Sequence, residues 1–557
     1  MSLGLHFDRL VTTMTMRPLC STSNAAALLT SLVLAGGLTV QAAEPTLPHL
    51  VRKDGRHALI VDGAPFLILG GQSHNSSAWP STLPKVWSAI ETLHANTLEV
   101  PISWEQFEPE AGRFDTSIVD ELLAGARERE VRLVLLWFGT WKNGSAHYLP
   151  MWMKRQPELC PRIIGKDGRR VDSPSPHVPA LLEADTRAFR ALMHHLKEVD
   201  PQHTVILVQV ENEPGAWNAI RDYSPAAQKL FTAPVPVELL KALGKESRTG
   251  GDWTAVFGKD ADEFFHAWSV ARFIGQVAAA GKAEYPLPLY VNAALRDPLS
   301  QPPAGTYESG GPTDNVLDIW KAAAPAVDLL APDIYMDDSA RHLKVLDLYS
   351  RPDNALFVPE TSRSPAVSHY FYAALARGAI GWSPFGVDSL VASAHASGAA
   401  PASDPAGEPF AANYRAISPM MREIAQLGFE GRLRAAVEEK DEHQEVIALG
   451  RWQAIVTFGP PTFGYGRSPQ GNPEPVGRVL IGQLGENEFL VTAYLCRVDF
   501  KVTDATSLAQ RDFLRVEEGR YEGGVFRPER IWNGDETDWA LNFGTAAQVL
   551  RVQLGTY

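Results

Sequence analysis

Between residues 58 and 400 the chain alternates short apolar runs with longer stretches of helical composition. Eight runs have the length of a strand and cover residues 65–69, 97–102, 132–137, 205–210, 288–291, 327–331, 356–359 and 378–381. Helical stretches fall between them, for example at 84–94, 118–129, 184–199 and 261–281. Strands and helices in regular alternation form parallel βα units, and eight such units close into a (β/α)8 barrel. The sequence therefore predicts an α/β protein built on a TIM barrel.

The composition changes after the last of these runs. Residues 393–407 are rich in Ala, Ser, Gly and Pro, and a helical stretch follows at 413–427. Beyond Arg432 come short alternating strands separated by Gly, Pro, Asn and Asp, at 446–449, 452–456, 478–481, 489–495 and 547–553. This pattern is typical of an antiparallel β-sandwich. We therefore expect a barrel at 43–427 and a β-sandwich domain at 428–557.

The first 42 residues have the features of a signal peptide. Arg17 precedes an apolar run at 25–40, and Val40-Gln41-Ala42 places small residues where cleavage would occur. Gly36 and Gly37 interrupt the run, so a membrane-spanning helix is not expected. The sequence thus predicts a secreted or periplasmic protein.

Charge and cysteine content exclude several classes of partner. The formal net charge of -14 argues against a nucleic-acid or anionic membrane surface and favours a neutral or cationic partner. Once the signal peptide is removed, Cys160 and Cys496 are the cysteines that remain, too few for a disulfide scaffold. The chain contains neither an HExxH nor a CxxC motif, so we expect no metal and no cofactor.

Two of the predicted barrel strands end in a carboxylate. The fourth runs from Val205 into Glu211-Asn212-Glu213, and the seventh ends at Glu360. The carboxyl ends of barrel strands carry the active site, and strands four and seven face each other across the barrel mouth. Two facing carboxylates are what glycoside hydrolysis requires, one as proton donor and one as nucleophile. The alternative is that one of the two carboxylates forms a structural ion pair with an Arg such as Arg363.

These motifs resemble those of glycoside hydrolase family 35, the β-galactosidases, within the larger clan of retaining barrel glycosidases. The segment Val208-Gln-Val-Glu-Asn-Glu-Pro-Gly215 resembles the acid/base strand of the family, and Trp104-Glu-Gln-Phe-Glu-Pro-Glu-Ala-Gly-Arg-Phe-Asp115 resembles its second-strand block. The resemblance covers residues 60 to 390. The tail is similar to the β-domain that follows the barrel in a bacterial branch of the family.

The resemblance implies a role for individual residues. Glu213 would be the acid/base, Glu360 the nucleophile, and Asn212 the partner of the sugar 2-hydroxyl. Tyr335 would orient the nucleophile, unless its hydroxyl bonds a loop carbonyl instead. The remaining candidates are substrate contacts, with Trp382 as the stacking floor and Trp141 and Trp217 as cleft walls, unless these two are packing residues. Asn75 and Glu105 would lie at the polar rim or behind the residues that touch the sugar.

The chain also departs from the family pattern. Pro214 follows Asn-Glu where many members have Tyr, and Pro101 stands where a sugar-contacting Tyr is common. After the third strand, Gly139-Thr140-Trp141 replaces Ala-Glu-Trp, so the hydrogen bonds that select galactose must be partly rebuilt. Residues 217–260 form a long insertion, which either shapes the substrate cleft or is a tolerated surface excursion.

The leading hypothesis is a retaining, exo-acting β-galactosidase that removes terminal β-D-galactosyl residues from oligo- or polysaccharides. Family habit suggests plant-wall xyloglucan or galactan fragments as substrates. One alternative keeps the mechanism on another β-glycoside, such as a β-arabinopyranoside or β-glucoside. The other is a non-catalytic carbohydrate-binding protein, which the presence of both carboxylates disfavours.

Overall fold

The computed structural model describes residues 46–390, 407–504 and 508–557. The predicted signal peptide at 1–42 and nearly all of the Ala/Ser/Gly/Pro-rich stretch at 393–407 lie outside the described residues. None of the described helices is long and apolar enough to cross a membrane. Cys160 and Cys496 are both buried and not joined in a disulfide.

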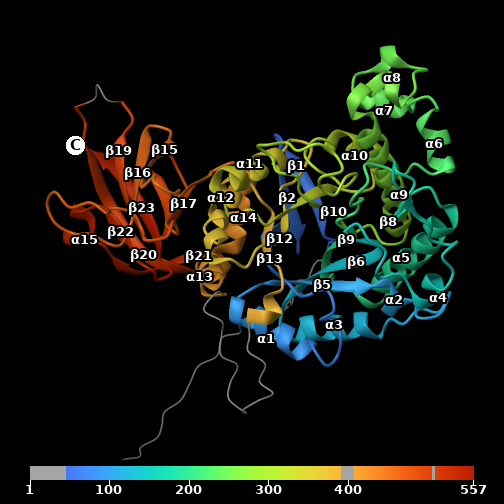
Figure 1. Ribbon diagram of the computed structural model, residues 1–557. Coiled ribbons are helices and arrows are strands. Elements are labelled where there is room, and N and C mark those ends of the chain that lie inside the picture. The colour runs from blue at the N-terminus through green and yellow to red at the C-terminus, as the bar shows by residue number, and fades with distance from the viewer. Residues whose placement is uncertain (1–45, 391–406, 505–507) are drawn as a thin grey trace, which may run out of the picture. The chain divides into compact units, whose positions relative to one another are not determined.

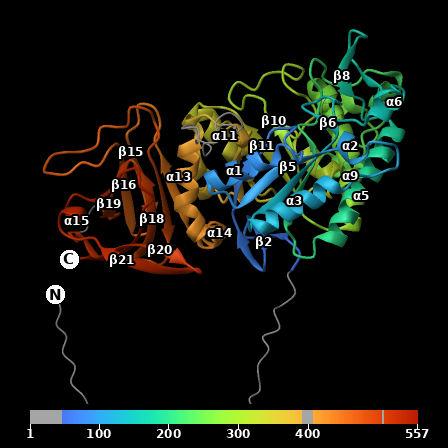
Figure 2. The same ribbon diagram turned by 90° about the horizontal axis from the view of Figure 1, so that it is seen from below.

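Eight parallel strands close into a barrel in the order β10-β11-β12-β13-β4-β5-β6-β9, which confirms the predicted fold. Figures 1 and 2 show these strands with helices α1, α3 and α5 outside them. The strands are β4 (Ile68–Gln72), β5 (Thr97–Ser103), β6 (Arg132–Lys142), β9 (Val205–Asn212), β10 (Leu289–Ala294), β11 (Leu329–Ile334), β12 (Val358–Thr361) and β13 (Gly381–Pro384).

All eight of these strands end one to five residues later than their apolar runs predict. Asn212 and Asn292 are examples of polar residues that stay within β9 and β10. A closed barrel pairs its strands up to the mouth, so a polar side chain there does not end the ladder. The first predicted strand, 65–69, is displaced by three residues, because residues 64–66 form the separate antiparallel strand β3 (Ala64–Phe66).

Helices connect the barrel strands, as the alternation predicts. The principal ones are α1 (Leu83–Leu93), α3 (Ser117–Glu128), α5 (Pro179–Val199), α9 (Ala261–Glu284), α10 (Leu317–Ala323), α11 (Ser339–Tyr349) and α12 (Tyr370–Ala376). The helix expected at 413–427 is instead divided into α13 (Glu408–Ile417) and α14 (Met421–Phe429). Pro419 lies between them in a 3-10 turn, because proline has no N–H to continue an α-helix.

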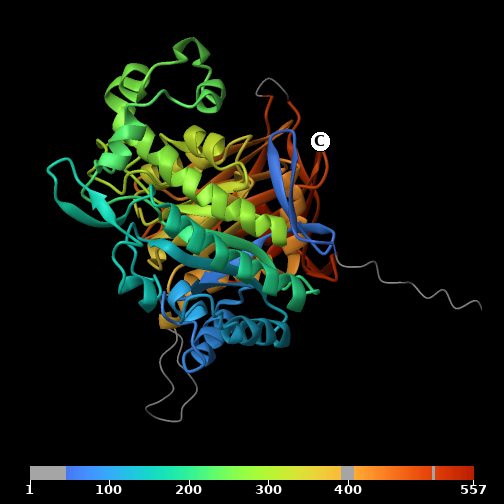
Figure 3. The same cartoon turned by 90° about the vertical axis from the view of Figure 1, so that its right-hand side faces the viewer.

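A small antiparallel sheet precedes the barrel. Strands β1 (His49–Lys53), β2 (Arg56–Val61) and β3 pair in that order, and β2 and β3 contact helix α14. Figure 3 shows this sheet in blue beside the orange helices. Arg422 of α14 fixes the contact by donating to the backbone oxygens of Val61 and Ala64, both at 2.8 Å. The sheet therefore joins the start of the described chain to the last helix before the sandwich.

The long insertion after β9 folds into short helices whose buried apolar side chains belong to the main core. They are α6 (Pro225–Phe231), α7 (Val237–Ala242) and α8 (Trp253–Phe257), and Figures 1 and 3 show them projecting beyond the barrel helices. Trp253 packs against Phe257 and against Phe265 of α9, with ring centroids 5.6 and 5.3 Å apart. Aromatic packing onto α9 thus anchors the insertion.

Two antiparallel sheets form the predicted β-sandwich. One has the order β14-β17-β18-β23-β20-β21 and the other β15-β16-β19-β22. Their bounds are β14 (Leu433–Val437), β15 (Gln444–Leu449), β16 (Trp452–Phe458), β17 (Arg478–Gln483), β18 (Glu488–Tyr494), β19 (Cys496–Val502), β20 (Arg511–Glu522), β21 (Val525–Ile531), β22 (Leu541–Phe543) and β23 (Val549–Thr556). Their inward apolar side chains share one core, and the buried Arg478 donates to Asn413 of α13 at 2.7 Å.

Candidate active site

The barrel interior is apolar for most of its depth and becomes polar at the carboxyl ends of the strands. On β11, Leu329 and Ala331 belong to the interior cluster, as does Tyr290 on β10. Side chains alternate along a strand, so the next inward positions are Asp333 on β11 and Asn292 on β10. Both are buried. A ring of polar groups therefore covers the apolar interior at the mouth.

Three carboxylates meet in this ring. Glu213 directly follows β9, Glu360 lies on β12, and Asp333 is the register partner of Glu360 on β11. One oxygen from each lies within 4.8 Å of the other two. Glu213 and Glu360 are only 7% and 5% exposed. Carboxyl groups about 5 Å apart are the arrangement of retaining glycosidases, whereas inverting enzymes separate them further to admit a water molecule.

Two hydrogen bonds hold the Glu360 carboxylate. The Tyr335 hydroxyl donates to Oε1 at 2.5 Å, and Gln72 Nε2 donates to Oε2 at 3.1 Å. Arg363 is directed elsewhere, because its Nη1 donates to the backbone oxygen of Gly386 at 3.2 Å. The Tyr335 contact is the orienting one that the resemblance implies, and the alternatives, a loop carbonyl for Tyr335 and an Arg363 ion pair, do not form. With one donor on each oxygen, the carboxylate is fixed in orientation and remains free of a cationic partner.

The Tyr335→Phe variant tests this orientation. Removing a hydrogen bond to a charged group costs about 1.5–3 kcal/mol, so we expect kcat to fall roughly 10- to 100-fold. The KM should change little, because the lost hydroxyl acts on Glu360. Steady-state kinetics beside the thermal midpoint of both proteins measures this. An unchanged kcat in a stable variant would show that Tyr335 does not position Glu360.

Glu213 is held in a strained backbone conformation. Its φ of 40° lies in the left-handed region that residues other than glycine rarely adopt. The amide of Asn292 stabilises this conformation, since Asn292 Oδ1 accepts from the Glu213 N–H at 2.9 Å. Nδ2 of the same amide donates to Asp333 Oδ2 at 2.6 Å. Asn292 therefore fixes Glu213 and Asp333 relative to each other.

Glu213 and Asp333 both favour the protonated form. Burial and then the negative charge of Glu360 raise the pKa of Glu213 to about 7, and the charge of Lys142 and a hydrogen bond from Asp333 oppose this rise. Burial also raises the pKa of Asp333 well above its usual range, and the charges of Glu360 and Glu213 add to this effect. Asp333 Oδ1 has no N–H donor among the described residues and lies toward Glu213. The two carboxyl groups are thus placed to share a proton.

Further buried carboxyl groups surround this centre. Glu308 is enclosed beside Gly144, and burial, followed by the charge of Glu213, raises the pKa of its carboxyl group. Glu211 accepts from the backbone N–H of Trp141 at 2.7 Å, and burial raises its pKa as well. Deeper in the barrel, Glu99 accepts from Ser383. Of these groups, Glu308 is the one whose ionisation the charge of Glu213 directly disfavours.

Two of the predicted aromatic contacts are corrected by the structure. Trp382 is fully buried, and its ring lies near His342 and Phe371 on the helix side of β13. It therefore offers no free face to a sugar. Trp141 is also fully buried and packs edge-on against Phe273 of α9, at 4.9 Å between ring centroids. Both residues lie within their strands at positions where the side chain points outward.

The other predicted contacts are distributed around the mouth. Trp217 is 43% exposed and lies over Gly144, as a cleft wall would. Asn212 is buried, and neither polar atom of its side chain has a partner within the described chain, nor does Oδ1 of Asn75. Unpaired buried amides of this kind are typical of sites that bind a polar ligand. Glu105 is instead a surface residue that forms an ion pair with Lys154 at 2.8 Å, which corrects its assignment as a substrate contact.

The departure at the third strand has a structural cause. Thr140 is buried and donates to Asp185 Oδ2 at 2.6 Å, away from the barrel mouth. A Cβ atom at Gly139 would come within 2.4 Å of Trp137 Nε1 and 2.9 Å of Glu211 Oε1. The chain therefore forms a different contact where family members have Ala-Glu.

Gln72, Asn292, Asp333 and Lys142 were missed as site residues by the sequence analysis. The signal that could have found them is alternation. Asp333 lies two residues before Tyr335 and therefore faces the same side, and Gln72 continues the inward positions of β4. Lys142 carries no such signal, because its position follows from β6 extending five residues beyond its predicted end.

Comparisons with known proteins place part of this chain among β-galactosidases. Residues 75–270 match the family model of glycoside hydrolase family 42, described as beta-galactosidase. The match includes Glu213 and ends before Glu360. Residues 410–544 match a family described as a domain of unknown function (DUF5597). The matched family is family 42, so the resemblance to family 35 stays a prediction.

Curated relatives and solved structures align with parts of this chain. Beta-galactosidase-1-like protein 3 of Homo sapiens is 29% identical over 196 residues, which cover 33% of this chain and 27% of that protein. The mouse protein of the same name is 28% identical over 33% of this chain and 28% of its own length. The beta-galactosidase from Bacillus circulans sp. alkalophilus aligns with 14% identity and a TM-score of 0.46 over 64% of this chain and 57% of that chain. Residues 75–270 are thus similar to a glycoside hydrolase family, and the chain matches less than a third of the length of these curated relatives.

Proposed function

We propose that the protein is a retaining β-galactosidase that hydrolyses terminal β-D-galactosides by double displacement. The observation that carries this proposal is the pair Glu213 and Glu360, on strands that face each other across the mouth, with carboxyl oxygens within 4.8 Å. At this separation one carboxylate reaches the anomeric carbon while the other reaches the glycosidic oxygen. The match of residues 75–270 to a beta-galactosidase family supports galactose as the sugar.

The mechanism follows from the environments of the two groups. Glu360, held by Tyr335 and Gln72, attacks the anomeric carbon as the glycosidic bond breaks. Protonated Glu213 gives its proton to the departing oxygen, and a covalent glycosyl-enzyme remains on Glu360. Ionised Glu213 then takes a proton from water, whose oxygen attacks the same carbon and releases Glu360. Two inversions at one carbon give net retention.

A panel of nitrophenyl glycosides tests the proposal and separates it from its alternatives. We expect the β-galactoside to have a higher kcat/KM than the β-glucoside and the β-arabinopyranoside. Proton NMR of the first product should show the β-anomer. A higher kcat/KM on the β-glucoside would make glucose the preferred sugar. First release of the α-anomer would exclude a retaining mechanism. Absence of turnover on every substrate would favour a carbohydrate-binding protein.

The pH dependence of the reaction tests whether Glu213 shares a proton with Asp333. Activity needs protonated Glu213, so kcat/KM should fall as the pH rises through its pKa of about 7. In Asp333→Asn, the new amide can donate to ionised Glu213 but cannot hold its proton. The hydrogen bond from Asp333 lowers the pKa of Glu213, and an amide is a weaker donor than a carboxyl group, so the alkaline limb should move to higher pH by up to about one unit.

The matched control for this shift is Glu105→Gln, which removes a carboxylate from the surface. Its alkaline limb should coincide with that of the unchanged protein. The alkaline limb of the pH profile could also stay in place in a folded and active Asp333→Asn protein. That result would show that Asp333 does not govern the protonation of Glu213.

A further inference from the structure

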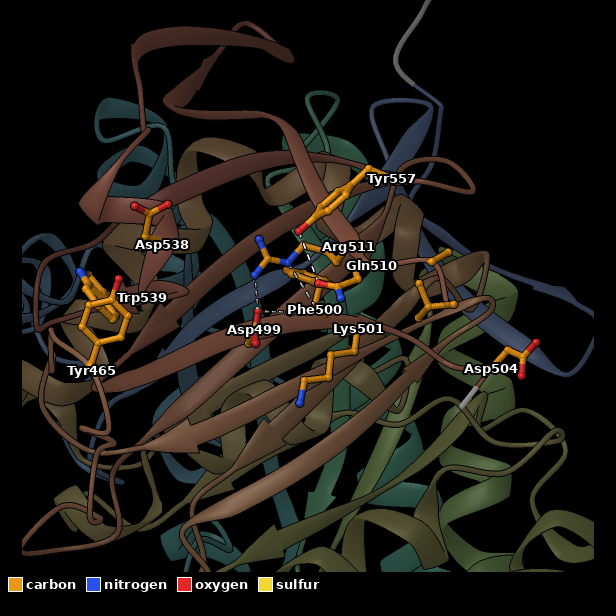
Figure 4. A pocket seen from close by; sticks show the side chains of 12 residues that line it. Tyr465, Asp499, Phe500, Lys501, Asp504, Gln510, Arg511, Asp538, Trp539 and Tyr557 are labelled. Carbon is orange, nitrogen blue, oxygen red and sulfur yellow. Dashed lines mark hydrogen bonds and ion pairs between the residues drawn. The ribbon is translucent and has the colours of Figure 1, made fainter. Parts of the chain in front are cut away.

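The β-sandwich contains a pocket that the barrel chemistry does not use. Strand β22 pairs with Cys496–Val498 of β19 and stops there, so the outer edge of β19 from Asp499 to Val502 has no strand partner among the described residues. A pocket of about 630 Å³ opens along this edge, between β19 and the start of β20 (Figure 4). This volume lies in the range of small-ligand sites, about 300–1,000 Å³.

An aromatic pair forms one end of the pocket. Tyr465 and Trp539 meet edge to face, with centroids 4.6 Å apart and an interplanar angle of 88°. Figure 4 shows them on one side of the Asp499–Arg511 ion pair, with Tyr557 on the other. Tyr465 is 93% exposed, so hydrophobic burial does not explain its position. A ring held by one neighbour and open to solvent is suited to stacking against a flat apolar surface.

Hydrogen-bonding groups line the rest of the pocket, and their charges nearly cancel. Arg511 forms an ion pair with Asp499 at 3.1 Å and donates from Nε to the Phe500 carbonyl at 3.4 Å. Lys501 and Asp538 are exposed. Lys501 has no ion-pair partner within residues 46–390, 407–504 and 508–557. Three Asp against one Lys and one Arg leave no strong field to attract an anion.

A ligand that fits this pocket must be close to neutral, carry one apolar face and offer several hydroxyl groups. A pyranose meets all three requirements, because its axial C–H bonds stack on aromatic rings while its hydroxyl groups bond to carboxylates and amines. We propose that this pocket is a second carbohydrate-binding site that holds a neutral oligosaccharide, with a sugar ring against Tyr465 and Trp539. Its lining residues all belong to residues 465–557, so binding here does not depend on turnover in the barrel.

Affinity electrophoresis tests this site with defined polysaccharides. Gels would contain soluble β-1,4-galactan, galactosylated xyloglucan or glucomannan, and the full chain would carry Glu360→Gln so that the polymer is not consumed. We expect at least one polymer to retard the protein. Combining Tyr465→Ala with Trp539→Ala should then raise the apparent dissociation constant at least about tenfold, since aromatic anchors carry much of the binding energy of a site.

The matched control is Phe463→Ala, which removes a half-exposed aromatic ring from the same loop outside the pocket. It should leave the retardation unchanged. In the chain with Glu360 intact, the double substitution should leave kcat/KM on nitrophenyl galactoside unchanged, which also reports correct folding. Absence of retardation by all three polymers would overturn the second site, as would equal retardation of the double variant. Either result can occur with full galactosidase activity, so failure of this proposal is distinct from failure of the proposed function.

Discussion

Glu360→Gln is expected to lower kcat/KM on nitrophenyl β-galactoside by roughly ten thousand-fold or more, the loss typical of removing a catalytic nucleophile. The amide has the shape of the carboxylate but cannot form the covalent glycosyl-enzyme. Tyr335 and Gln72 would still find an oxygen or nitrogen partner at the same positions, so the fold should be preserved. Stopped assays with purified protein, beside a thermal unfolding curve, measure both effects.

Glu105→Gln is the control for that loss. Glu105 also lies close after a barrel strand, but its carboxylate forms a surface ion pair with Lys154, so its removal should change kcat/KM by less than about twofold. Activity of Glu360→Gln within tenfold of the unchanged enzyme would exclude Glu360 as the nucleophile. Asp333, its register partner, would then be the next carboxylate to test.

Glu213→Ala is expected to have an effect that depends on the leaving group. General acid catalysis contributes about 10²- to 10⁴-fold, and this contribution is needed when the leaving oxygen is basic. A natural oligosaccharide should therefore lose that factor, whereas dinitrophenyl galactoside needs no proton and should still form the glycosyl-enzyme. The second step should stall, because no base remains to activate water. A burst of dinitrophenol followed by a slow steady state would record this behaviour.

Azide provides the internal test of the same variant. It needs no general base and is small enough to occupy the space that the Glu213 side chain vacates. Added azide should therefore accelerate turnover of dinitrophenyl galactoside by Glu213→Ala and give β-galactosyl azide. An α-galactosyl azide would mean that azide replaced the nucleophile, and the two roles would have to be exchanged. Equal losses on natural and activated substrates would likewise contradict an acid role for Glu213.

The positions of Glu213 and Glu360 could be predicted because each directly follows an apolar run that only a buried strand explains. The barrel was predictable for the same reason, since its alternation of strands and helices is repeated along the chain. Helix α9 extends from Ala261 as predicted, because its apolar positions continue without a proline. Local composition is therefore sufficient to predict a strand or helix whose residues are buried along its whole length.

The orientation of side chains near strand ends could not be predicted as well. The eighth strand was placed at 378–381, but β13 covers Gly381–Pro384, so Trp382 lies inside the ladder and faces the helices. A displacement by an odd number of residues exchanges the two faces of a strand. Strand β4 is displaced from its predicted position by three residues as well, so Gln72 was not recognised as an inward-facing residue of the strand. Proton sharing between Asp333 and Glu213 depends on the Asn292 amide between them, a contact across three strands that the sequence does not encode locally.

Trapping of the glycosyl-enzyme tests the central claim most directly. A 2-deoxy-2-fluoro-galactoside with a dinitrophenyl leaving group slows both steps and allows the covalent intermediate to accumulate. Peptide mass spectrometry of the inactivated protein should place one fluorogalactosyl group on Glu360. The same experiment on Glu360→Gln should give no label. A label on Glu213, or on Asp333, would contradict the assignment of Glu360 as the nucleophile of a retaining β-galactosidase.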